Sequence, residues 1–199
     1  MNRLTVIILA ACSIARCALA DEATAQYRLT GLFEPDRVAD LRRQAGALSA
    51  GEKDAPTEVR LVDVNYDTSI VTFAYDPAAK PFKGADAKKV RDLISNLLRG
   101  ATKGTFDVFP LSALKPGEQQ ELRIAVAELD CKGCAYGAYR AVAAIEGLER
   151  ATVSFKEGWL KAWIDPARTN QEAVVAALEK AHVDVIKPGP AGAEKQPNK

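Results

Sequence analysis

The predicted strands and helices follow the order strand-helix-strand-strand-helix-strand twice, and this repeat constrains the fold more than any other feature. Alternating apolar residues predict strands, and apolar residues three and four positions apart predict helices. In the first half these elements are a strand at 27–33, a helix at 35–48, strands at 59–64 and 71–75, a helix around 90–98 and a strand at 106–109. A polar loop is predicted at 49–56.

The second half repeats this order. Its predicted elements are a strand at 122–127, a helix at 134–145, strands at 151–155 and 160–164, a helix around 174–178 and a last strand at 183–186. An Asp-Pro pair follows the third strand in both halves, as Asp76-Pro77 and as Asp165-Pro166. The pattern therefore predicts an internal duplication of class α+β. Each half is expected to form a ferredoxin-like sandwich with a four-stranded antiparallel sheet.

The ends of the chain differ in composition from these halves. Residues 1–20 combine an arginine, an apolar run and Ala18-Leu19-Ala20 before acidic residues, which is typical of a signal peptide. The apolar run is shorter than the roughly 20 residues that a membrane span needs. We therefore expect an exported protein, periplasmic or secreted. The alternative is a lipoprotein anchored to the membrane through Cys12.

The predicted organisation has five segments. They are the signal peptide at 1–20, a ferredoxin-like domain without thiols at 25–112, a linker at 113–120, a thiol-bearing domain at 121–187 and a disordered tail at 188–199. The charges are nearly balanced, with 27 Lys and Arg against 26 Asp and Glu. Such a chain has no global field to attract nucleic acid, and we expect no nucleic-acid binding.

Cys131 and Cys134 are the candidate functional residues, because the other two cysteines lie in the predicted signal peptide. They stand where a strand turns into a helix. Free N–H groups and the helix dipole favour a thiolate there. Two sulfurs at this spacing can hold one soft metal ion. In an oxidising compartment the same pair can instead form a disulfide.

The second half resembles the heavy-metal-associated domain of copper chaperones, periplasmic mercury-binding proteins and the N-terminal modules of metal-exporting P-type ATPases. The family motif is roughly G-M-x-C-x-x-C, followed by an apolar helix, G-V and a valine strand. Here Glu128 and Leu129 replace the glycine and methionine, and Gly147-Leu148 and Val153 follow. The first half is similar only in topology, and its corresponding turn, 31–34, has no soft ligand.

The resemblance implies further ligands. An aspartate at the position of Asp130 resembles a third, hard ligand in members that export divalent ions, and its alternative role is to cap the helix. The loop before the last strand lies beside the cysteines in this family, so His182 is also a candidate ligand. A set of two sulfurs, one oxygen and one nitrogen suits Zn(II), whereas two sulfurs alone suit Cu(I) or Hg(II). Cd(II) is a further candidate ion.

The sequence therefore predicts a metal-binding protein, a chaperone, scavenger or sensor, rather than an enzyme. Its expected partners are the metal ion and a metal-transporting ATPase or another envelope protein. One alternative is a thiol–disulfide oxidoreductase, and another is an interaction module with oxidised cysteines. Trp159 and Trp163 alternate with inward residues, so we expect them on the open face of the second sheet, packed against the first half or the linker. The alternative is that they form a docking surface for a partner.

Overall fold

Regularly spaced apolar residues account for most of the helices and strands of the first half. They are β1 (Ala23–Thr30), α1 (Arg37–Ala45), β2 (Ala47–Glu52), β3 (Ala55–Asn65), β4 (Ile70–Tyr75), α2 (Ala87–Ala101) and β5 (Asp107–Phe109). In α2, Val90, Ile94 and Leu98 are buried on one face, as their spacing predicts. The side chain of Asp86 caps this helix by accepting a hydrogen bond from the backbone N–H of Lys89 at 2.7 Å.

The second half begins with a short 3-10 turn. Its elements are η1 (Pro116–Glu118), β6 (Gln120–Ala125), α3 (Lys132–Ala143), β7 (Leu148–Ser154), β8 (Trp159–Ile164) and α4 (Gln171–Lys180). This computed structural model describes residues 22–52, 55–127 and 129–186. The expected signal peptide, Cys12 and the expected tail at 188–199 lie outside these ranges. No helix among the described residues is both long and apolar enough to cross a membrane.

The first sheet has five strands in the order β2-β3-β4-β1-β5, with all neighbours antiparallel. The prediction of four strands was wrong here. We expected a loop at 49–56, but residues 49–52 belong to β2 and residues 55–56 begin β3, and the two strands pair with each other. The first helix accordingly ends at Ala45, and Leu48 is buried on β2 rather than on the helix.

The second sheet has three strands in the order β6-β8-β7. A fourth strand at 183–186 was expected, but an isolated bridge between Val126 and Val185 takes its place. Two hydrogen bonds flank this bridge, from the backbone N–H of Ala127 to Asp184 O at 2.8 Å and from that of Ile186 to Ala125 O at 3.0 Å. The second half is therefore a reduced version of the predicted sandwich.

The two halves share one topology despite these differences. With β2 set aside, the first sheet reads β3-β4-β1-β5, and the second reads β7-β8-β6 followed by the bridge at Val185. The Asp-Pro pair also forms the same turn twice. Asp76 accepts a hydrogen bond from the N–H of Ala78 at 2.8 Å, and Asp165 accepts one from Ala167 at 3.0 Å. This agreement supports the predicted duplication.

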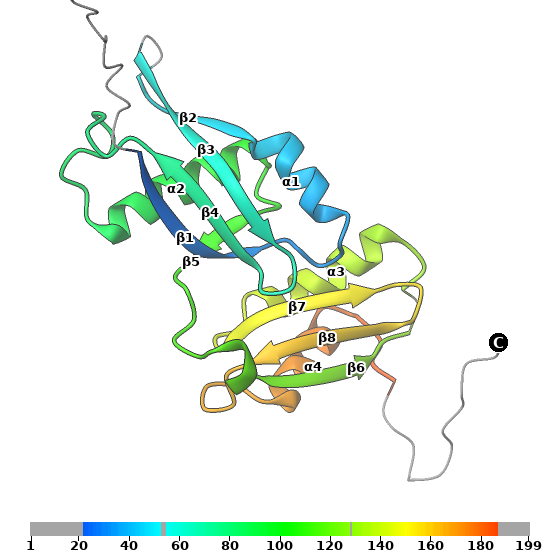
Figure 1. Cartoon of the computed structure of the whole chain (residues 1–199). Coiled ribbons are helices and arrows are strands. Elements are labelled where there is room, and N and C mark those ends of the chain that lie inside the picture. Colours follow the sequence, from blue (N-terminus) through cyan, green and yellow to red (C-terminus); the bar gives the residue numbers. More distant parts are fainter. Residues whose placement is uncertain (1–21, 53–54, 128, 187–199) are drawn as a thin grey trace, which may run out of the picture.

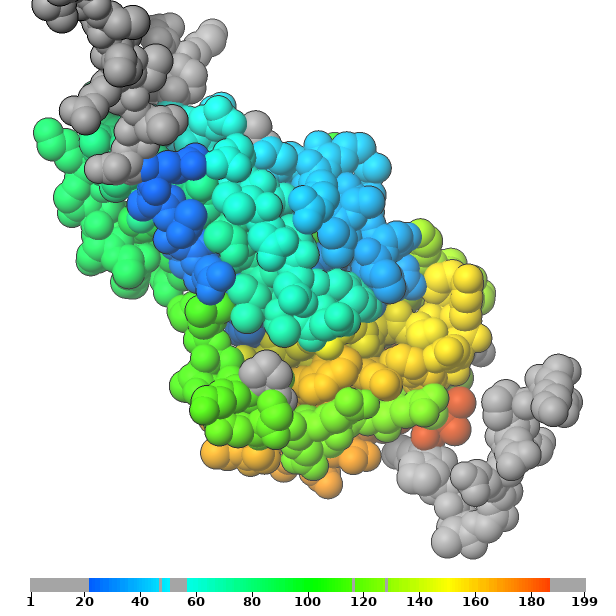
Figure 2. Space-filling model, viewed as in Figure 1, coloured from blue at the N-terminus to red at the C-terminus, as the bar shows by residue number. Residues whose placement is uncertain are grey.

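The turn after β1 joins the two halves. Phe33 belongs to the first half but is buried in the core of the second, where its ring lies 5.5 Å from the rings of both Tyr136 and Tyr139. Its carbonyl oxygen accepts a hydrogen bond from the N–H of Val153 on β7 at 2.9 Å. The turn that lacks a soft ligand is therefore a packing element. Figures 1 and 2 show the first half seated above the yellow strand β7.

Gly31 makes this approach sterically feasible. Its N–H donates a hydrogen bond to the hydroxyl of Tyr139 on α3 at 2.6 Å, in a buried position. Its φ is +100°, and a Cβ atom there would lie 2.4 Å from the carbonyl oxygen of Thr105. Only glycine combines this backbone conformation with this close contact. The turn thereby fixes the position of α3, whose first residues form the candidate site.

Both tryptophans of the second half are half-buried where the halves meet. The guanidinium of Arg150 lies 4.1 Å from the ring centroid of Trp163 and 5.1 Å from that of Tyr66 on the first half. Trp163 lines a cleft with Leu111 and Leu114 of the connecting segment. Trp163 thus borders the first half and the linker across this cleft, with Arg150 between its ring and that of Tyr66.

Candidate metal site

Cys131 and Cys134 lie at the beginning of α3, as their position between a strand and a helix predicts. Cys131 is the residue that caps the helix, with an extended backbone at φ −149° and ψ 162°. Its Sγ accepts a hydrogen bond from the N–H of Cys134 at 3.2 Å. A sulfur atom thus takes the place that the side-chain oxygen of a serine or an aspartate commonly has at a helix N-terminus. The buried Leu129 and Ala135 on either side hold this turn against the core.

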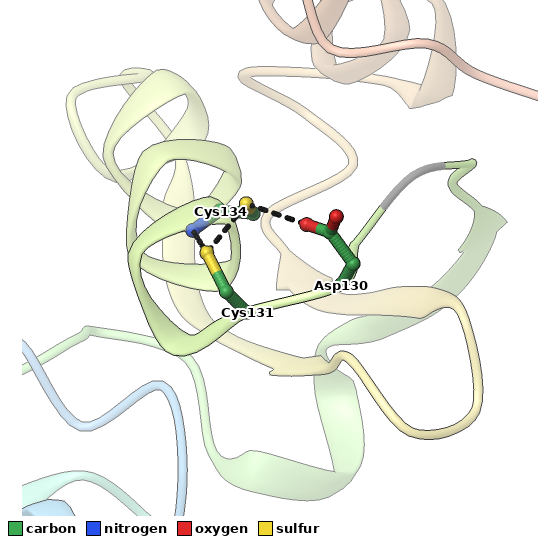
Figure 3. Close-up of side chains that lie close together, drawn as sticks. All are labelled: Asp130, Cys131 and Cys134. Atoms are coloured by element: carbon green, nitrogen blue, oxygen red, sulfur yellow. Dashed lines mark hydrogen bonds between the residues drawn. The ribbon is translucent and has the colours of Figure 1, made fainter.

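Three ligand atoms converge at this turn (Figure 3). Sγ of Cys131 and Sγ of Cys134 are 2.7 Å apart, and both cysteines are free thiols. The thiol of Cys134 donates a hydrogen bond to Oδ1 of Asp130 at 3.1 Å. All three ligand atoms lie within 4.8 Å of one another. Cys131 is exposed and Cys134 is half-buried, so an ion or another thiol can reach them from solvent.

The two thiols have different pKa values because their sulfur atoms make different hydrogen bonds. The pKa of Cys131 is lowered, first by the hydrogen bond between its sulfur and the Cys134 thiol and next by hydrogen bonds from the backbone N–H groups of Cys134 and Gly133. The pKa of Cys134 is raised to about 11 by its hydrogen bonds to Cys131 and to Asp130. Cys131 is therefore the first of the two to become a thiolate.

This difference predicts selective alkylation. In the reduced protein, iodoacetamide should modify Cys131 well before Cys134, because the thiolate is the reactive form. Asp130→Asn should increase the alkylation rate of Cys134, because it removes one cause of the raised pKa of that thiol. The rates of Cys131 and Cys134 should then differ less. Peptide mapping by mass spectrometry after brief exposure at mildly alkaline pH measures both rates. Equal rates for the two cysteines would contradict the geometry described above.

The site adjoins the first half through Lys132, which stands between the cysteines. Its ammonium pairs with the carboxylate of Asp36, and this contact raises the pKa of Lys132. The side chains are 66% and 49% exposed, so solvent screening leaves the pair little weight in stability. Burial of Phe33 is the stronger attachment. Sequence reasoning missed both contacts, because no local pattern marks residues so far apart in the chain; Lys132 and Asp36 are separated by 96 positions.

His182 is not part of this group. Its imidazole is absent from the set of described ligand atoms that lie within 4.8 Å of one another. It is exposed at the end of α4 with a left-handed φ of 59°, and its N–H donates to Glu179 O at 3.0 Å. The structure therefore brings together Asp130, Cys131 and Cys134 but leaves out the fourth candidate ligand.

A metal ion fits this donor set after a small rearrangement. Zn–S bonds of about 2.3 Å place two sulfurs of a tetrahedral site about 3.8 Å apart. The sulfurs at 2.7 Å would have to separate by about 1 Å, which side-chain rotation at an exposed turn permits. The carboxylate of Asp130 would then coordinate the ion instead of accepting a hydrogen bond from the Cys134 thiol. The arrangement favours soft or borderline ions, because two of its three donors are sulfur.

No family model matches the chain, and no curated protein matches its sequence. Solved structures do resemble parts of it. The structure of "CopZ metallochaperone" is 21% identical and covers 34% of this chain and 100% of its own, with a TM-score of 0.33. Oxidized MerP from Ralstonia metallidurans CH34 is 20% identical and covers 34% and 94%, with a TM-score of 0.33. The water-soluble region of the P-type ATPase CopA from Bacillus subtilis is 16% identical and covers 84% and 91%, with a TM-score of 0.32.

Proposed function

We propose that this protein binds one soft or borderline metal ion, Cu(I) or Zn(II), between Cys131 and Cys134 and hands it to or takes it from another protein. The observation that carries the proposal is the convergence of two free sulfurs and one carboxylate oxygen at an accessible helix N-terminus. The function is transport, scavenging or sensing of the ion, which is cargo and undergoes no reaction.

Exchange of the ion follows from the shape of the site. Binding releases the thiol protons, and the cap N–H of Cys134 remains to stabilise the sulfur of Cys131. Cys131 is exposed, so a thiolate of an incoming protein can add to the ion before either cysteine leaves it. The ion then passes between proteins through shared ligands and is never free.

Asp130 is the proposed determinant of which ion binds. A carboxylate suits a divalent borderline ion such as Zn(II), whereas Cu(I) needs only the two sulfurs. Asp130→Asn is therefore expected to weaken Zn(II) binding by about 10–100-fold and to change Cu(I) binding little. Competition titrations with chromophoric chelators measure both affinities. His182→Ala is the matched control and should change neither affinity. Equal losses of Zn(II) and Cu(I) affinity in Asp130→Asn would contradict the proposal that this carboxylate selects the ion.

Two parallel measurements separate this function from a thiol–disulfide oxidoreductase. The reduced protein is titrated with Cu(I) under anaerobic conditions and is assayed for insulin reduction. Metal binding predicts uptake of one ion per chain and no turnover above that of free dithiol. Turnover without stoichiometric uptake would favour the oxidoreductase. A chain that is purified with its cysteines oxidised and stays so under mild reductant would favour the interaction module.

We also propose that the protein acts outside the cytoplasm and exchanges metal with a metal-transporting ATPase or another envelope protein. The support is the signal-peptide pattern at 1–20 and the resemblance of the second half to metal-handling modules. Export predicts a purified chain whose N-terminus is Asp21, which intact mass measurement of protein from a cell envelope fraction tests. A mass that retains residues 1–20 would contradict export with cleavage, and an added lipid on Cys12 would favour the lipoprotein.

A further inference from the structure

The outer edge of β6 is the feature of the second sheet that the proposed function does not use. Among the described residues, β6 pairs with β8 on one side, and its other side meets only the single bridge from Val126 to Val185. Figure 1 shows β6 as the outermost strand of this sheet. An open strand edge is a template for pairing with another strand.

The backbone groups that face outward are those of Glu121 and Arg123. The N–H of Val126 donates to Gly158 O beside β8 at 2.9 Å, whereas Ala125 O accepts from Ile186 on the outer side at 3.0 Å. Successive residues of a strand direct their N–H and C=O groups to opposite sides. The outward N–H and C=O groups of Glu121 and Arg123 therefore have no backbone partner among the described residues, whereas the outward carbonyl of Ala125 is already bonded to Ile186.

The sequence beyond Ile186 disfavours a strand along this edge, because it contains two prolines at alternate positions. With Val185 opposite Val126, a strand that continued beyond Ile186 would place Pro188 opposite Arg123. That position requires an N–H group to bond to the outward carbonyl, and proline has none. Pro190 would stand opposite Glu121 with the same defect.

We propose that a second copy of this chain pairs with the edge, β6 against β6, in antiparallel register about a two-fold axis at Leu122. This register places Glu121 opposite Arg123 of the second copy, and Arg123 opposite its Glu121. These are the residues with outward backbone groups, so each pair exchanges two backbone hydrogen bonds. Opposite charges directly across an antiparallel pair attract, and the contact is the same on both copies.

The side chains around the edge fit this contact. Glu121 and Arg123 are exposed on the same face of the sheet, and Glu121 pairs with Lys161 of β8 at 3.3 Å. A groove of about 620 Å³ lies along the edge, and its lining mixes apolar residues such as Val175 and Ile186 with polar ones such as Gln171. Ile186 is 55% exposed. Pairing of the edges brings the two grooves together and removes this apolar surface from water.

Charge reversal tests the register. Glu121→Arg alone and Arg123→Glu alone each place like charges across the contact, so each should weaken self-association by about tenfold or more. The double variant Glu121→Arg/Arg123→Glu restores opposite charges and should associate as the natural chain does. An equimolar mixture of the two single variants should form a mixed dimer for the same reason.

Sedimentation of the full chain over a concentration series measures the association, with chelator and reductant present to exclude links through the cysteines. Hydrogen exchange should slow at the amides of Glu121 and Arg123 as concentration rises. Three results would overturn the proposal: a monomer at every concentration, a dimer that both single reversals leave intact, or a double variant that stays monomeric while circular dichroism shows it folded. Metal uptake by Cys131 and Cys134 is measured in a separate titration. Absence of metal uptake would therefore contradict the proposed function and leave the test of self-association unaffected.

Discussion

Replacement of Cys131 by serine is expected to weaken Cu(I) binding by more than about 100-fold, because loss of groups that merely orient a ligand already weakens metal affinity by about 10–100-fold. A serine hydroxyl does not ionise near neutral pH and is a hard donor that Cu(I) disfavours. The fold should survive, because Cys131 is exposed and serine is a preferred residue at a helix N-cap. Competition titration and thermal unfolding measure the two effects.

Cys134→Ser should produce a comparable loss, since the ion needs both sulfurs. Gly137→Ala is the matched control on the same helix. It adds a methyl group at an exposed position where no atom lies within 4 Å, so metal affinity should be unchanged. Retention of tight Cu(I) binding in either serine variant would contradict the proposed site, as would unfolding of both variants.

Phe33→Ala should lower the free energy of unfolding of the second half by about 3 kcal/mol, within the range for removal of a buried aromatic ring. Phe33 is 4% exposed and packs against Tyr136 and Tyr139. It also lies 5.3 Å below the guanidinium of Arg37. The chain has two tryptophans, Trp159 and Trp163, both in the second half. Urea unfolding followed by tryptophan fluorescence therefore reports on the half that loses the ring.

Phe109→Ala is the matched control for this variant. It removes the same ring from a side chain that is 39% exposed at the end of β5. Its cost, measured by circular dichroism because that signal reports on both halves, should be well under half as much. If Phe33→Ala cost as little as this control, Phe33 would not be an anchor between the halves. The two halves would then be two similar units that fold independently of each other.

Much of the fold follows from local patterns. The apolar spacing in α2 and the alternation in β8 produce the expected helix and strand, and each Asp-Pro pair forms the expected turn. The β2–β3 hairpin escaped prediction because 49–56 is rich in polar and small residues and lacks the β-branched residues that mark most strands. The last strand reduces to one bridge at Val185, since Pro188 follows so soon after it.

Part of the candidate site was also predictable, because it depends on local sequence. Asp130, Cys131 and Cys134 are neighbours in sequence, so the strand-to-helix turn suffices to bring them together. His182 depends on where a distant loop lies, and the structure leaves it outside the group. The contact of Gly31 with Tyr139 spans 108 positions and has no counterpart in periodicity or composition. Long-range packing of this kind is set by the assembled cores and not by local sequence.

X-ray absorption at the copper edge of the Cu(I)-loaded protein tests the central claim most directly. We expect two sulfur neighbours per copper in the natural chain, one in Cys131→Ser and one in Cys134→Ser, with no nitrogen neighbour from His182. A spectrum of the natural chain with fewer than two sulfurs, or one that either serine variant leaves unchanged, would contradict the account.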